Sequence, residues 1–241
     1  MRIAFRFRPI PFVATVLLVA LGIALGNWQQ GRAEYKAALQ ARIAERGADA
    51  PVRLGPAPAE LAPLEFRRVS VTGHFVDAWP VFLDNRPMRG QAGFYLVMPF
   101  KIAGSEMHVL VARGWLPRQA EYGKLPRIDT PRGTVTIEGI VTANPGRLMQ
   151  LGTPAPLAPN AIVQNVEVAG FAQASGLALQ PFFVQQTGPE MAGEALVRDW
   201  PAPSAGIDKH RGYALQWYGL AAMAFLFFVI TGIRSGTKHV D

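Results

Sequence analysis

The residues best placed to do chemistry lie where the last apolar segment of the chain begins. His210 is flanked by Lys209 and Arg211, and the 21 residues from Tyr213 to Ile233 carry no charge. A segment of that length can cross a bilayer core at about 1.5 Å per residue. A histidine at such a boundary is either part of a polar interfacial anchor or a functional group. The residues around it leave both interpretations open.

Helical spacing adds aromatic rings to this histidine. If a helix begins near residue 207, then His210, Tyr213 and Trp217 share one face with the small residues Ala214 and Ala221. This face offers an imidazole nitrogen, two rings and space beside them, and the cations at positions 209 and 211 could pair with carboxylates. Haem is a flat, apolar iron ligand with carboxylates at one edge, and it suits such a set. Tyrosine and tryptophan also occur at membrane interfaces without any ligand, however.

Other chemistry finds little support in the sequence. The chain has no cysteine, which excludes disulfides, thiolate metal sites and haem attachment through C-x-x-C-H. It has no G-x-S-x-G, H-E-x-x-H, phosphate-loop or dinucleotide-binding motif. The remaining histidines show no metal-ligand spacing, since His74 lies on the polar face of a strand, His108 in an apolar strand and His239 in the carboxyl-terminal tail. We therefore expect a protein that is not an enzyme.

A second apolar segment, Ile10–Leu25, lies near the amino terminus. It fits either a signal peptide or a retained membrane anchor, and the anchor is favoured because Trp28 suits the headgroup level. Gly22 and Gly26 form a G-x-x-x-G pair, which predicts close approach of the second membrane helix or of a partner's helix.

The two tails are short and basic, so the positive-inside rule orients both towards the cytoplasm. The net charge of +7 is then explained mainly by the basic tails that orient the chain in the membrane, and it does not indicate a nucleic-acid partner. There is no room before Ile10 for an organelle presequence, which favours a bacterial inner membrane. The expected division is a cytoplasmic tail (1–9), a first transmembrane helix (10–28), a periplasmic domain (29–209), a second transmembrane helix (210–233) and a second cytoplasmic tail (234–241).

The central region has the pattern of an α+β domain. A helix is expected over 29–46, ended by Gly47, followed by an extended connector over 48–63. A second helix over 166–175 would be capped by Asn165 and ended by Gly176. Alternating or continuous apolar runs predict strands over 69–75, 81–85, 94–100, 107–113, 134–143 and 182–187. We expect an antiparallel β-rich domain, arranged as a meander or a partly closed barrel, between two transmembrane helices.

Four motifs on this two-span chain resemble the Surfeit locus protein 1 family. The run H-x-x-Y-A-x-x-W from His210 to Trp217 is similar to that family's carboxyl-terminal signature. The run from Gly26 to Arg32, which includes Trp28, resembles its G-x-W-Q-x-x-R motif. The strands Val71–Phe75 and Val111–Pro117, the latter containing Arg113, Gly114 and Trp115, resemble its V-x-G-x-F and R-G-W-x-P motifs. Asp208, Lys209, Arg211 and Gln216 depart from the residues usual in the family.

The resemblance implies an assembly factor for haem–copper cytochrome c oxidase that acts when haem a is supplied to subunit I. It implies that His210 is the iron ligand. Tyr213 and Trp217 would then pack against the macrocycle, and Arg211 or Lys209 would hold the propionates. Subunit I, and with it haem A synthase, are the expected partners.

The alternative is a cofactor-free scaffold that stabilises an oxidase assembly intermediate. Its packing or contact residues would be Gly22, Gly26, Trp28, Arg32 and the Arg113–Gly114–Trp115 corner, although Trp115 could equally fill the core. A sensory protein is disfavoured because neither tail is long enough to form an output domain.

Overall fold

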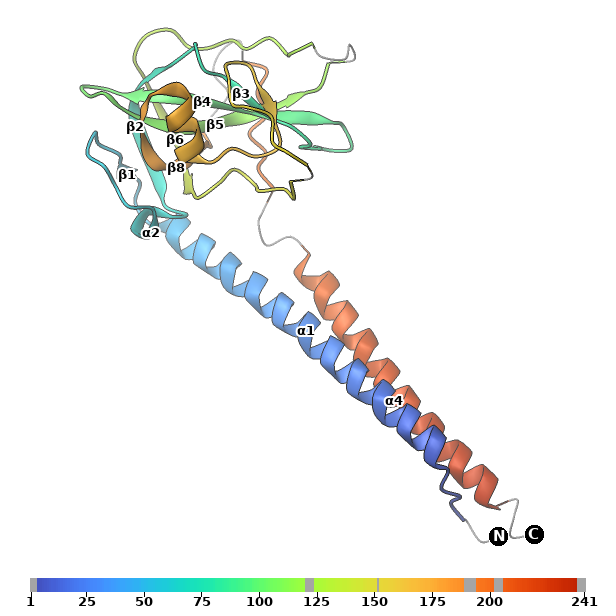
Figure 1. Cartoon of the computed structure of the whole chain (residues 1–241). Coiled ribbons are helices and arrows are strands. Elements are labelled where there is room, and N and C mark those ends of the chain that lie inside the picture. Colours follow the sequence, from blue (N-terminus) through green and yellow to red (C-terminus); the bar gives the residue numbers. More distant parts are fainter. Residues whose placement is uncertain (1–3, 120–123, 151, 189–193, 202–205, 238–241) are drawn as a thin grey trace. The chain divides into compact units, whose positions relative to one another are not determined.

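The computed structural model describes residues 4–119, 124–150, 152–188, 194–201 and 206–237 (Figure 1). The chain divides into two compact units. The first, which we call the helical pair, comprises the chain up to Ala41 and from Pro201 onward. The second, Arg42–Trp200, is the barrel domain. Each unit is described separately.

The helical pair is formed by two long apolar helices that run side by side in opposite directions (Figure 1). They are α1 (Pro9–Ala48) and α4 (Ile207–Thr237), and both are long and apolar enough to cross a membrane. The start of α1 meets the end of α4, since the Arg6 N–H donates to the Gly232 carbonyl oxygen at 3.0 Å. The helix expected over 29–46 is confirmed as the continuation of α1 beyond its apolar part, and α1 ends at Ala48, one residue after Gly47.

The described residues of the barrel domain form eight strands and two short helices. The segment expected as an extended connector contains β1 (Val52–Arg53) and the single-turn α2 (Leu61–Leu64). The other elements are β2 (Arg68–Phe75), β3 (Val81–Leu83), β4 (Gly93–Ile102), β5 (Met107–Pro117), β6 (Val135–Thr142), β7 (Ile162–Val163), α3 (Val168–Ser175) and β8 (Ala178–Gln186).

Five of the strands close into a barrel. They pair in the order β2-β6-β8-β5-β4, and β4 then returns to β2 through pairs such as Phe75 with Phe100. The expected antiparallel arrangement holds for β3, β4 and β5 and for both neighbours of β6. It fails where β5 pairs with β8, because those two strands are parallel. A parallel pair needs a long crossover, and the chain between β5 and β8 provides it with β6, β7 and α3.

The burial pattern of each strand follows from its position in the barrel. β2 and β6 alternate between buried and more exposed residues, so they have one face in the core. β4 and β5 are buried almost throughout, because an apolar cluster inside the barrel covers one face and a second cluster around Phe171 of α3 covers the other. Gly176 ends α3 in the left-handed conformation, as the sequence predicts.

Asn165 does not cap α3. The residue at the cap position is Glu167, whose side chain makes no capping hydrogen bond. The Asn165 amide instead pairs with the backbone of Leu148, accepting from its N–H at 2.8 Å and donating to its carbonyl oxygen at 2.9 Å. The capping prediction was therefore wrong, because a loop distant in sequence satisfies this side chain.

Candidate functional site

His210 lies in the first turn of α4 and its ring faces α1. Its backbone N–H donates to the Gly206 carbonyl oxygen at 3.3 Å, and its side chain is half-buried. The ring Nδ1 lies 2.7 Å from Oε1 of Gln29 on α1. The histidine of one long helix is thus held by a side chain of the other.

This contact determines which ring nitrogen is available. An amide oxygen only accepts hydrogen bonds, so Nδ1 of His210 must carry the proton and donate to Gln29. The lone pair of the neutral imidazole then resides on Nε2. Metal-ligating histidines are commonly oriented by such an Nδ1–H bond to an oxygen. The geometry therefore prepares Nε2 of His210 to bind a metal or to accept a proton.

The other residues expected around His210 lie at different depths in the helical pair. Ala214 and Ala221 are buried against α1, and Trp217 is half-buried. Tyr213 is 51% exposed and lies on the rim of this face. Arg211 is exposed, and its Nη1 lies 3.8 Å from the Asp208 carboxylate, too far for a strong ion pair. The imidazole and the two aromatic rings thus lie on one side of α4, and Arg211 is a loosely held cation next to His210 in the sequence.

The two glycines of the G-x-x-x-G pair lie where the helices are closest. A Cβ on Gly22 would be 2.9 Å from Ala221 Cβ and 3.0 Å from the Trp217 carbonyl oxygen. A Cβ on Gly26 would be 2.3 Å from the ring of Tyr218. A larger residue at Gly22 would push α4 away from α1, and one at Gly26 would displace the Tyr218 ring that packs over it.

Trp28 and Arg32 do not take part in this contact. Trp28 is 59% exposed and Arg32 is also exposed, whereas Gly26 and Ala33 on the same helix are buried. In the part of the chain that the structure describes, these two side chains are therefore not brought together with His210.

The sequence missed two polar contacts between the helices. One is the Gln29 partner of His210, and the other is a hydrogen bond of 2.8 Å from the Tyr218 hydroxyl to Oδ1 of Asn27. Asn27 and Gln29 both lie in the G-x-W-Q-x-x-R-like run. Polar side chains at the end of a membrane span indicate that a polar contact could form there. The partner could not be predicted, because it depends on the register of two helices that are far apart in the sequence.

The motif of Arg113, Gly114 and Trp115 lies in the barrel domain, where its residues stabilise the fold. The β4–β5 register shifts between Leu96 and Val97, and this leaves Arg113 as an extra residue on β5. Its fully buried guanidinium faces the barrel interior, with Met98 Sδ at 3.3 Å and the Phe75 ring centroid at 4.4 Å.

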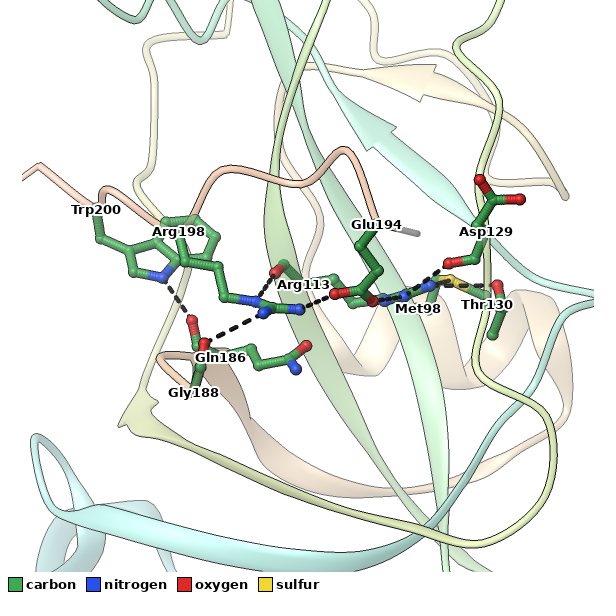
Figure 2. A network of polar contacts seen from close by, with 9 residues as sticks. All are labelled: Met98, Arg113, Asp129, Thr130, Gln186, Gly188, Glu194, Arg198 and Trp200. Carbon is green, nitrogen blue, oxygen red and sulfur yellow. Dashed lines mark hydrogen bonds and ion pairs between the residues drawn. The ribbon is translucent and has the colours of Figure 1, made fainter. Parts of the chain in front are cut away.

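A carboxylate and a second arginine complete the Arg113 cluster (Figure 2). Glu194, whose side chain is 2% exposed, forms ion pairs with both Arg113 and Arg198. Burial lowers the pKa of Arg113, and the charge of Glu194 opposes that shift. Because Nε of Arg198 also donates to the Arg113 carbonyl oxygen at 3.0 Å, the cluster fastens residues 194–198 to β5.

The neighbouring residues of the motif fix the same strand. Trp115 is buried, donates from Nε1 to the Arg86 carbonyl oxygen at 2.6 Å, and pairs through its backbone with Val197. A Cβ on Gly114 would be 3.0 Å from Leu196 Cβ, so this position needs a glycine for the segment to approach. Among the residues that the structure describes, no three His, Asp or Glu side chains lie close enough together to hold a metal ion.

These observations define a class of protein. The chain combines two helices that could span a membrane with a closed β-barrel domain, and a histidine on the helical pair is held by a hydrogen bond to the other helix. Residues 16–222 match the SURF1 family, and the chain belongs to that family.

Relatives from animals and bacteria cover most of the chain. Surfeit locus protein 1 of Mus musculus is 26% identical over 88% of this chain and 73% of its own length. The human Surfeit locus protein 1 is 27% identical over 88% of this chain and 75% of its own length. A SURF1-like protein of Rickettsia felis is 26% identical over 86% of this chain and 90% of its own length. The SURF1 family consists of cytochrome c oxidase assembly factors rather than enzymes.

Proposed function

We propose that this protein assists the assembly of a haem–copper cytochrome c oxidase by binding haem a at His210 and helping its insertion into subunit I. The observation that carries the proposal is the 2.7 Å contact between His210 Nδ1 and Gln29 Oε1, which leaves Nε2 as the ligand atom. Bound haem a would be cargo passed to the oxidase, so no turnover is required of this chain.

The residues near His210 fit such a group. A haem needs an axial nitrogen, apolar or aromatic surface for the macrocycle, and cations for two propionates. Nε2 of His210 would supply the first, and Trp217 and Tyr213 the second. Arg211 and Lys209 are exposed, and they flank His210 in sequence where propionates would meet water. Arg211 would have to leave Asp208, and at 3.8 Å that contact costs little to break.

The proposed location is a bacterial inner membrane, with the barrel domain in the periplasm and both ends of the chain in the cytoplasm. The basic residues before α1 and at the end of α4, such as Arg6, Arg8 and Arg234, support this orientation. Subunit I would then meet the helical pair within the bilayer, and haem A synthase is the expected donor. A carboxyl-terminal alkaline phosphatase fusion should be inactive, since that enzyme folds only outside the cytoplasm. An active fusion would reverse the orientation.

The ligand role is tested by producing the full chain together with the enzymes of haem a synthesis. The purified protein should show a reduced-minus-oxidised haem a spectrum that His210→Ala removes. His74→Ala is the matched control, because His74 is an exposed histidine on β2 of the barrel domain. Equal haem content in wild type and His210→Ala would contradict the proposal.

The alternative function is a scaffold without cofactor, and the close packing at Gly22 and Gly26 favours it as the second candidate. That packing fixes α1 against α4 and requires no ligand. Under this alternative, a His210→Ala strain assembles its oxidase normally, whereas Gly26→Leu impairs assembly. Under the haem proposal both variants impair it, and only His210→Ala does so with the helical pair intact.

A further inference from the structure

The helical pair carries an apolar groove on the side of Trp217. It has a volume of about 370 Å³, within the range of small-molecule sites. Its sides are formed by bulky residues of both helices, among them Leu18, Leu21, Trp217 and Phe227, and its floor by Gly22 and Ala224. The small floor residues leave an apolar channel between the flanking side chains.

The groove lies in line with His210. Positions 210, 217 and 224 of α4 are seven residues apart, close to two helical turns, so His210, Trp217 and Ala224 form one stripe. Gln29 and Gly22 are related in the same way on α1. The groove therefore begins about 10 Å from His210 along the helix axis and extends roughly another 15 Å to Phe227 at 1.5 Å per residue.

We propose that this groove binds the isoprenoid side chain of haem a. The inference rests on the proposed haem site at His210 and adds a residue set that distinguishes haem a from haem b. Haem a carries a hydroxyethylfarnesyl chain, which is long, apolar and narrow, whereas haem b has a vinyl group at that position. A macrocycle held at His210 and packed on Trp217 would place such a chain at the start of the groove.

The shape of the groove argues against a partner helix as the occupant. Close approach of a membrane helix backbone is favoured by a stripe of small residues on the receiving surface. Here Leu18 and Leu21 on α1, and Leu220 and Met223 on α4, rise on both sides of the floor. Met223 is flexible, and it can adjust to a branched chain of irregular outline.

The test compares haem a with haem b on the full-length protein in detergent. Ala224→Phe fills the floor of the groove, and Ala222→Phe adds the same ring at an exposed position outside it. We expect wild type to bind haem a at least tenfold more tightly than haem b. Ala224→Phe should lose that preference while binding haem b as before, and Ala222→Phe should keep the preference.

A competitor separates the side chain from the ring. Farnesol should displace haem a, but not haem b, from wild type and from Ala222→Phe. Equal affinity of wild type for the two haems, or unchanged haem a binding by Ala224→Phe, would overturn the groove assignment and leave the His210 site standing. Competition by oleate as strong as that by farnesol would make the groove a general lipid surface and would also overturn it. Absence of any His210-dependent haem binding would refute the proposed function itself, and the groove assignment with it.

Discussion

A hydrogen bond of 2.7 Å joins His210 Nδ1 on α4 to Gln29 Oε1 on α1, between residues that are 181 positions apart in the chain. Both residues lie in motifs that characterise the two ends of the sequence. The contact brings the two motifs together in this chain: one supplies the imidazole, and the other orients it. It also makes Gln29 a positioning residue for any ligand on Nε2.

Replacing Gln29 with leucine should weaken haem binding about 10–100-fold, the usual cost of losing the group that orients a ligating histidine. Gln29→Glu should retain binding, because a carboxylate accepts the same bond, and should lower the haem midpoint potential by making the imidazole a stronger donor. Spectroscopic titration and potentiometry measure both effects. Gln30→Leu is the control, since Gln30 donates instead to Glu34 on its own helix. If Gln29→Leu and Gln30→Leu behaved alike, the orienting role would be disproved.

The register of the helical pair predicts a specific cross-link. The chain has no cysteine, so a Gly22→Cys/Ala221→Cys pair introduces the only two thiols. A Cβ on Gly22 lies 2.9 Å from Ala221 Cβ, and a small separation of the helices would bring the pair to disulfide geometry. After mild oxidation and proteolysis within the barrel domain, the two halves should remain joined on a non-reducing gel. The pair Gly22→Cys/Leu215→Cys should separate, because Leu215 is 73% exposed.

Glu194 should be among the most sensitive positions of the barrel domain. Glu194→Gln removes the carboxylate that pairs with the buried guanidinium groups of Arg113 and Arg198, and breaking one partner of a buried pair costs about 3–5 kcal/mol. Urea unfolding of the full-length protein, followed by tryptophan fluorescence, measures this loss. The control is Glu106→Gln, because the Lys101–Glu106 pair is largely exposed on the Glu106 side and its loss should change the stability far less. If the two variants were equally stable, the Arg113 cluster would not stabilise the barrel domain.

Most strands of the barrel could be predicted from the alternation of apolar and polar residues. The pairing that closes the barrel could not be predicted in this way. The apolar residues of β2 and β6 recur every second position, which identifies each strand and its buried face. The parallel pairing of β5 with β8 depends instead on a crossover of about 60 residues, for which no local signal exists. The strands β1 and β7 have two residues each and are too short for any period to show.

The candidate site also combines features that depend on nearby residues with contacts between residues far apart in the sequence. The imidazole, the aromatic residues and the glycine pair could be recognised because each depends on spacing within one helix. Gln29 could not be assigned a partner, because that partner depends on the antiparallel register of α1 and α4. The roles of Arg211, Tyr213 and Trp217 towards a ligand stay predictions.

Acidification should destabilise the barrel domain through His108. This residue is buried on β5, its Nδ1 donates to the Ala178 carbonyl oxygen at 3.2 Å, and burial lowers the pKa of its imidazole below the ordinary 6.5. Lys101 lowers that pKa further, while Glu106 and the backbone oxygens oppose the shift. As the pH falls through 6.5, the unfolded chain therefore binds a proton that the folded chain does not, and the free energy of unfolding decreases.

The slope from this single proton is at most about 1.4 kcal/mol per pH unit. Urea midpoints at pH 7.5 and pH 5.5 should differ in wild type and in His74→Gln, whose histidine is exposed. The difference should shrink in His108→Gln, because glutamine can donate to the Ala178 carbonyl oxygen but binds no proton in this range. If His108→Gln kept the full pH dependence, other groups would have to carry it, and the buried imidazole of β5 would have no part in the acid response of the domain.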